Sequence, residues 1–71
     1  MSSEEEQIKK LMQYATSAND NVKAEVIDAL AEYGEKGIEP IYNIIDKTNN
    51  DALKIRGLQA LKSIKEKGRA S

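Results

Sequence analysis

The carboxylates closest together in the chain are Glu4, Glu5 and Glu6. Carboxylates grouped in this way can act as general acids or bases. However, Ser3 stands three residues before Glu6, and this Ser-x-x-Glu spacing is that of a capping box at the start of a helix. Acidic side chains are also favoured in the first turn by the helix dipole. We therefore interpret the three glutamates as a solvated first turn and not as a catalytic site.

The remaining residue types offer little for catalysis. The chain has neither His nor Cys, which excludes the usual ligand sets for zinc, iron–sulfur clusters and haem. The segment Gly34-Glu35-Lys36-Gly37 follows an expected helix rather than a strand, so it indicates a turn and not a phosphate-binding loop. We expect a protein that is not an enzyme and that has no metal and no small-molecule cofactor.

Cations accumulate near the C-terminus. At about 100° per residue, four of them fall within an arc of roughly 80° on one helix: Lys54, Lys62, Lys65 and Arg69. Such a face is a candidate surface for phosphates or for a protein partner. Leu58 shares the arc, and no aromatic residue is interleaved for base stacking. Nucleic-acid binding is therefore the alternative hypothesis, beside a solvated helix whose C-terminal cations suit the helix dipole.

The three tyrosines have different expected roles. Tyr14 lies off the apolar stripe of its helix, which makes it a candidate exposed contact for a partner. Helical spacing places Tyr33 and Tyr42 in the core, with their hydroxyl groups reaching the rim.

The spacing of apolar residues predicts four helices in a single all-α domain spanning residues 1–71. Their expected ranges are about 4–17, 21–33, 38–47 and 51–67. The two middle helices are apolar over a wide arc and the outer two over a narrow stripe, which is typical of a layered array with its ends facing water.

Local signals set the expected helix boundaries. Asp20 is the expected N-cap of the second helix, and Gly34 is its expected left-handed C-cap. Pro40 fits the first turn of the third helix, and Gly68 is expected to end the fourth.

Two helices carry a clear inward stripe. In the first helix it consists of Ile8, Leu11, Met12 and Ala15. In the fourth helix the residues expected to point inward are Leu53, Leu58, Leu61 and Ile64.

Size and charge bear on the partners. A 71-residue chain buries only about 60% of its unfolded surface, so it gains from further burial. Residues 1–35 carry eight acids and three bases, net −5, and residues 36–71 carry four acids and eight bases, net +4. This asymmetry, with apolar surface beside Met12 and Leu58, favours self-association.

No apolar run approaches the roughly 18 residues of a membrane span, and the acidic start is unlike a signal peptide, so we expect a cytoplasmic protein without membrane contacts.

The chain repeats itself with a period of 31 residues. This shift aligns nineteen positions, 19–37 with 50–68, and eight of them are identical. The identical pairs include Asn19 with Asn50 and Leu30 with Leu61, and Ile27 is aligned with Leu58. A repeat of this length indicates a stack of helix pairs.

The repeated residues resemble the HEAT-like repeats first named from phycobilisome lyases, over residues 7 to 67. The resemblance is carried by Asp20-Asn21-Val22-Lys23, Ala29-Leu30, Tyr33-Gly34, Glu39-Pro40-Ile41, Asp51-x-Leu53-Lys54 and Ala60-Leu61. Two positions depart from the pattern: Lys65 stands where the family favours Gly, and Gly57 stands where it favours a small apolar residue.

The resemblance implies a four-helix α-α superhelix fragment of about two helix pairs. It also implies a scaffold that binds a protein partner, without the pigment-attachment activity that belongs to longer proteins. In such repeats an acid and a base link neighbouring units, so the residues expected to be structural are Asp20, Asp51, Lys23 and Lys54.

Overall fold

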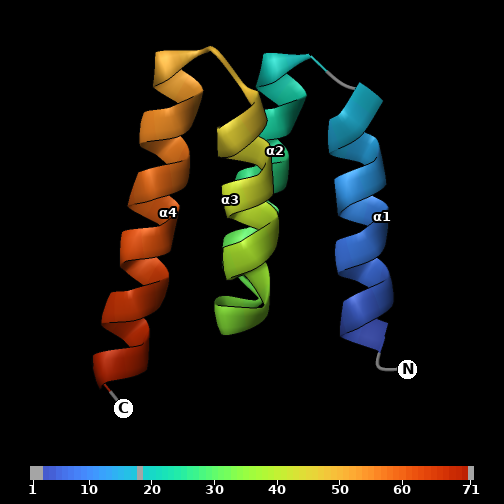
Figure 1. Ribbon diagram of the computed structural model, residues 1–71. Coiled ribbons are helices and arrows are strands. Elements are labelled where there is room, and N and C mark those ends of the chain that lie inside the picture. The colour runs from blue at the N-terminus through green and yellow to red at the C-terminus, as the bar shows by residue number, and fades with distance from the viewer. Residues whose placement is uncertain (1–2, 18, 71) are drawn as a thin grey trace.

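The computed structural model describes residues 3–17 and 19–70, and α-helices make up most of this part of the chain (Figure 1). In order, the elements are α1 (Ser3–Ser17), α2 (Asp20–Ala31), the short 3₁₀ helix η1 (Gly34–Gly37), α3 (Ile38–Lys47) and α4 (Asp51–Ala70). The described residues contain no strand, so the predicted all-α class is confirmed. None of the described helices is long and apolar enough to cross a membrane.

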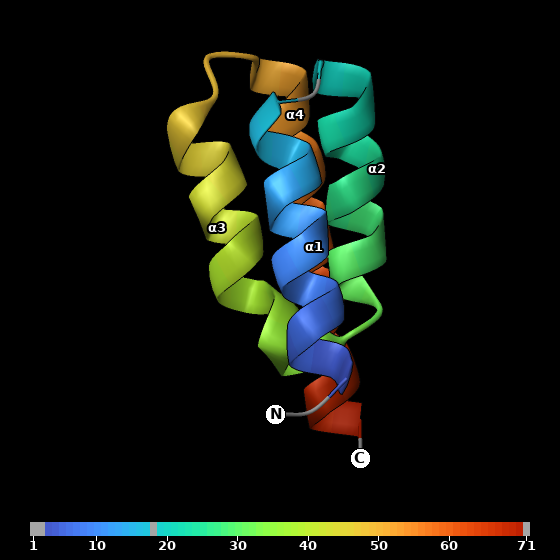
Figure 2. The same ribbon diagram turned by 90° about the vertical axis from the view of Figure 1, so that its right-hand side faces the viewer.

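The helices form a layered stack. α2 and α3 pack together in the middle, α1 lies on one side of this pair and α4 on the other (Figures 1 and 2). α1 packs mainly on α2, whereas α4 packs closely on both α2 and α3. The buried core consists of Ala15, Val26, Ile27, Leu30, Ile41, Ile44, Ile45, Leu53, Leu61 and Ile64. The broad apolar arcs predicted for the middle helices therefore do face neighbours on two sides.

α2 and α4 begin in the same way. The Asn19 side-chain oxygen accepts a hydrogen bond from the Val22 backbone N–H at 3.0 Å. The Asn50 side-chain oxygen accepts hydrogen bonds from the N–H groups of Ala52 at 2.9 Å and Leu53 at 3.3 Å. The prediction that Asp20 is the N-cap of α2 is wrong. Asn19 has the extended backbone of a cap, and Asp20 is already the first helical residue.

The two helices end differently. Gly34 has φ 67°, the left-handed conformation that glycine tolerates best, and α2 ends at Ala31, two residues before the expected end. In α4 the register-equivalent residue is Lys65, which has no such preference. The helix therefore continues to Ala70, and the prediction that Gly68 ends it is wrong.

Gly57 sets the rotation of α4 about its axis. It is buried, and a Cβ atom there would overlap the Ile45 Cγ2 methyl group of α3. Because the glycine faces α3, the next residue, Leu58, is turned by about 100° out of the contact. Leu58 is 54% exposed, so its predicted inward position is wrong, while those of Leu53, Leu61 and Ile64 are confirmed.

Candidate interaction surface

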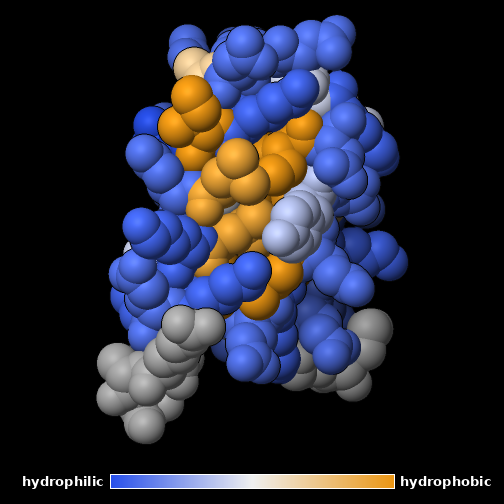
Figure 3. Space-filling view, turned by 60° about the vertical axis from the view of Figure 1, so that its left-hand side comes forward, coloured by the Kyte–Doolittle hydropathy of each residue, from blue (hydrophilic) through white to orange (hydrophobic). Residues whose placement is uncertain are grey.

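An exposed apolar patch spans α3 and α4 (Figure 3). Ile55 is 56% and Leu58 54% exposed on α4, and Tyr42 is 41% exposed on α3. We call these three residues the α3–α4 face. The expectation that Tyr42 belongs to the core is wrong, because Tyr42 lies about 60° around α3 from Ile45, the residue that faces Gly57. A contiguous apolar patch on a small protein indicates an interaction surface.

Comparison of the two repeats shows why the α3–α4 face is uncovered. Leu58 aligns with Ile27, which is 0% exposed. Ile27 lies on α2, which packs against three α-helices, α1, α3 and α4, whereas the α-helices packed on α4 are α2 and α3, and η1 contacts both α2 and α4. Among the described residues α4 thus lacks a neighbour on the side that carries Leu58. The position is apolar in both repeats but is covered in only one.

Three of the predicted basic residues lie beside this patch. Lys54, Lys62 and Lys65 are exposed and share the arc of Leu58 on α4. Lys62 lies 4.0 Å from a carboxylate oxygen of Glu66, an exposed pair of little energetic weight. The side chain of the fourth predicted residue, Arg69, lies outside the described part of the structure.

Carboxylates border the same patch on α3. Both Asp46 and Glu39 are exposed, and around the axis of α3 they lie roughly 40° and 60° from Tyr42, on the side of Tyr42 away from Ile45 and α4. Glu39 also lines a hollow with Glu5 and Ile8 of α1. The ion pairs within residues 3–17 and 19–70 include neither of these acids, nor Lys54 or Lys65. The α3–α4 face therefore has a basic rim on α4 and an acidic rim on α3.

Tyr14 lies elsewhere on the molecule. It is 63% exposed, which confirms the predicted exposure, but it belongs to α1, on the opposite side of the α2–α3 pair from α4 (Figures 1 and 2). The structure does not bring it together with the predicted basic residues. Tyr33 is half-buried, in keeping with its expected place at the rim of the core.

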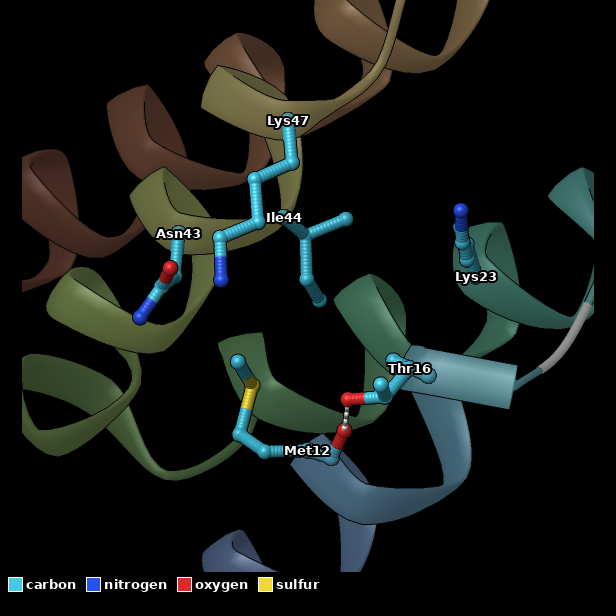
Figure 4. A pocket seen from close by; sticks show the side chains of 7 residues that line it. Met12, Thr16, Lys23, Asn43, Ile44 and Lys47 are labelled. Carbon is cyan, nitrogen blue, oxygen red and sulfur yellow. Dashed lines mark hydrogen bonds between the residues drawn. The ribbon is translucent and has the colours of Figure 1, made fainter.

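A small pocket of about 180 Å³ opens between α1 and α3 (Figure 4). Met12, Ala15 and Ile44 supply its apolar lining, and Thr16, Lys23, Asn43 and Lys47 its polar lining. The Thr16 hydroxyl donates a hydrogen bond to the Met12 carbonyl at 2.9 Å. The predicted apolar surface beside Met12 thus lines this pocket and is separate from the surface beside Leu58.

Two polar contacts link α2 to the α4 end of the stack. The Asn50 side-chain N–H donates to an Asp20 carboxylate oxygen at 2.8 Å, so Asp20 links the two repeats through an amide and not through a basic residue. Arg56 binds Asp28 through two guanidinium nitrogens, with Nε donating to Oδ1 at 3.2 Å. This hydrogen bond and the charge of Asp28 raise the pKa of Arg56 above its ordinary value.

The Arg56–Asp28 pair was not among the contacts predicted from the sequence. The aligned residue in the first repeat is Glu25, and this reversal of charge at position 56 was the available signal. The other residues predicted to link the repeats do not do so among the described residues: Lys23 lines the α1–α3 pocket, and the described ion pairs do not include Asp51 or Lys54.

The glutamates of α1 do not converge on a site within the described chain. Glu4 is exposed and accepts a hydrogen bond from the Lys36 ammonium at 3.0 Å. Residues 3–17 and 19–70 contain no group of three or more acidic, His or Cys side chains that could hold a metal ion.

Comparison with known proteins gives no family model, no curated protein and no solved structure that matches this chain.

Proposed function

We propose that the chain is a non-catalytic protein-interaction module, a HEAT-like fragment of an α-α superhelix that receives a helix of a protein partner on the α3–α4 face. The observation that carries this proposal is the exposure of Leu58 at a position whose repeat equivalent, Ile27, is fully buried. A cytoplasmic location, expected from the sequence, is part of the same proposal.

The chemistry of the surface defines the partner. Ile55 and Leu58 are three residues apart on one helix and offer anchors for the apolar face of an amphipathic helix. Full burial of such side chains is worth about 1.5–3 kcal/mol each. The lysines around them favour a helix with acidic side chains next to its apolar stripe.

The chain itself supplies a suitable probe. α3 follows α2 in sequence and packs on it, so a helix of the same type can pack on α4 in an equivalent way. The probe is a peptide of residues 36–50 with blocked ends and a fluorescent label. Its affinity for the full chain is measured by anisotropy at chain concentrations too low for self-association.

Two exposed apolar residues give a matched pair of variants, Leu58→Glu and Tyr14→Glu. We expect saturable binding that Leu58→Glu weakens at least tenfold and Tyr14→Glu leaves unchanged. Circular dichroism confirms that both variants are folded. No binding to the wild-type chain, or equal losses in the two variants, would argue against the proposal.

The second candidate function is nucleic-acid binding through Lys54, Lys62, Lys65 and Arg69. The favouring observation is that Lys54, Lys62 and Lys65 are exposed on one arc of α4. The presence of Leu58 on the same arc argues against nucleic-acid binding, because a leucine side chain makes no favourable contact with phosphates. Affinity for a short single strand at ~0.15 M salt that is lost on replacing the three lysines by Gln would favour this second function.

A further inference from the structure

We propose that the occupant of the α3–α4 face is a second copy of this chain, related to the first by a two-fold axis that runs parallel to α3 and α4. This inference rests on the proposed function and names its partner. It follows from the distribution of charge around the apolar patch, from the heights of the charged residues along the two helices, and from the size of the chain.

Charge decides how two copies can face each other. α3 and α4 are antiparallel neighbours (Figure 1), one with the acidic rim and the other with the basic rim. A two-fold axis across the helices would place α4 against α4 and bring lysines together. An axis along the helices places α4 of one copy against α3 of the other, so that each basic rim meets an acidic rim. Only the second arrangement pairs opposite charges, and a two-fold axis forms each contact twice.

The heights of the charged residues match this arrangement. The close approach of Gly57 to Ile45 fixes the height of α4 relative to α3. With a rise of about 1.5 Å per residue, the difference in height along the helix axes is about 3 Å between Lys54 and Asp46 and about 1.5 Å between Lys62 and Glu39. An axis parallel to the helices leaves these heights unchanged. Lys54 of one copy thus meets Asp46 of the other, and Lys62 meets Glu39.

The apolar residues take part in the same contact. Leu58 lies about 3 Å in height from Tyr42, so each copy places its leucine against the tyrosine of the other. A standard interface buries about 800 Å² of each partner, roughly a sixth of the 5108 Å² surface of this chain. Burial on this scale would stabilise a domain whose own core is small.

Sedimentation equilibrium from ~5 to ~500 μM tests whether the dimer forms. We expect a monomer–dimer equilibrium that Leu58→Glu shifts at least tenfold toward monomer and Tyr14→Glu does not shift. A wild-type chain that stays monomeric up to ~500 μM, or a dimer that Leu58→Glu leaves intact, would overturn the inference. A monomeric chain that still binds the peptide of residues 36–50 overturns the second copy as occupant but supports the proposed function.

A charge-swap cycle tests the direction of the axis. We expect Asp46→Lys and Lys54→Asp each to weaken the dimer about tenfold, and the double variant to restore most of the loss, because it re-creates opposite charges across the axis. If Lys54→Asp instead strengthens the dimer, α4 lies against α4, and the proposed axis is wrong. If the double variant is as weak as the single ones, the Lys54–Asp46 pairing is wrong.

Discussion

Asn50 and Asp20 join the N-terminal ends of α4 and α2 by a hydrogen bond of 2.8 Å from the asparagine amide to the aspartate oxygen. The same Asn50 side chain caps α4 through its oxygen. One residue therefore starts a helix and fixes that helix to the preceding repeat. Its counterpart Asn19 caps α2 through its own oxygen.

We expect Asn50→Ala to lower the free energy of unfolding by about 1–2 kcal/mol, because it removes both the cap and the link. Asn19→Ala removes a cap and should cost about 1 kcal/mol. Urea denaturation of the two variants makes the comparison. A smaller loss for Asn50→Ala than for Asn19→Ala would contradict a role of Asn50 beyond capping.

Gly57→Ala should destabilise the protein, although alanine favours a helix by about 1 kcal/mol relative to glycine. Its Cβ would overlap the Ile45 methyl group, and overpacking of a core costs about 1–3 kcal/mol. Thermal unfolding followed by circular dichroism measures the change, with the exposed Ser63→Ala in the same helix as control. An increase in melting temperature for Gly57→Ala would show that α3 and α4 are not in close contact there.

Gly34→Ala should lower the unfolding free energy by about 1–2 kcal/mol, since its positive φ costs an L-residue about that much. Gly34→Asn should cost less, because asparagine tolerates the left-handed conformation better. No atom lies within 4 Å of a Cβ built there, so steric overlap does not add to the cost. Equal stability of wild type, Ala and Asn variants in urea denaturation would refute the left-handed turn.

The contribution of Arg56 to stability should not change with pH in the neutral range. Asp28 raises the pKa of Arg56 above its ordinary, already strongly basic value, so the stabilisation is fully present in the neutral range and is lost at high pH only as the pH rises through the still higher pKa of the folded state. The stability difference between wild type and Arg56→Gln should thus be equal at pH 6 and pH 9, and should shrink with salt. The exposed Lys67→Gln serves as control. A difference that changes between these two pH values would mean that the pair with Asp28 is not the main contact of Arg56.

The helices were predictable from local signals, and some of their ends were not. The range of α3 follows directly from Pro40 and the isoleucine spacing. The start of α2 was displaced by one residue because Asn19 and Asp20 are both good caps, and only the extended backbone at Asn19 distinguishes them. The continuation of α4 past Gly68 depends on the absence of a left-handed residue at position 65, a signal that the repeat alignment already contained.

The candidate surface was predictable only in part. The arc of lysines on α4 could be projected from the sequence, but the projection placed Leu58 inward. Its exposure depends on the close approach at Gly57, a tertiary contact between α3 and α4 that no local pattern encodes. The carboxylates of α3 border the same surface as the lysines of α4 only because α3 and α4 pack side by side.

The most direct test of the proposed interaction surface is a methyl-resolved NMR titration of the chain with the unlabelled peptide of residues 36–50. We expect the largest shifts at the methyl groups of Ile55 and Leu58, with those of Ile8 on α1 unchanged. Shifts centred on α1, or shifts spread evenly over the core, would contradict the assignment of the α3–α4 face as the interaction surface.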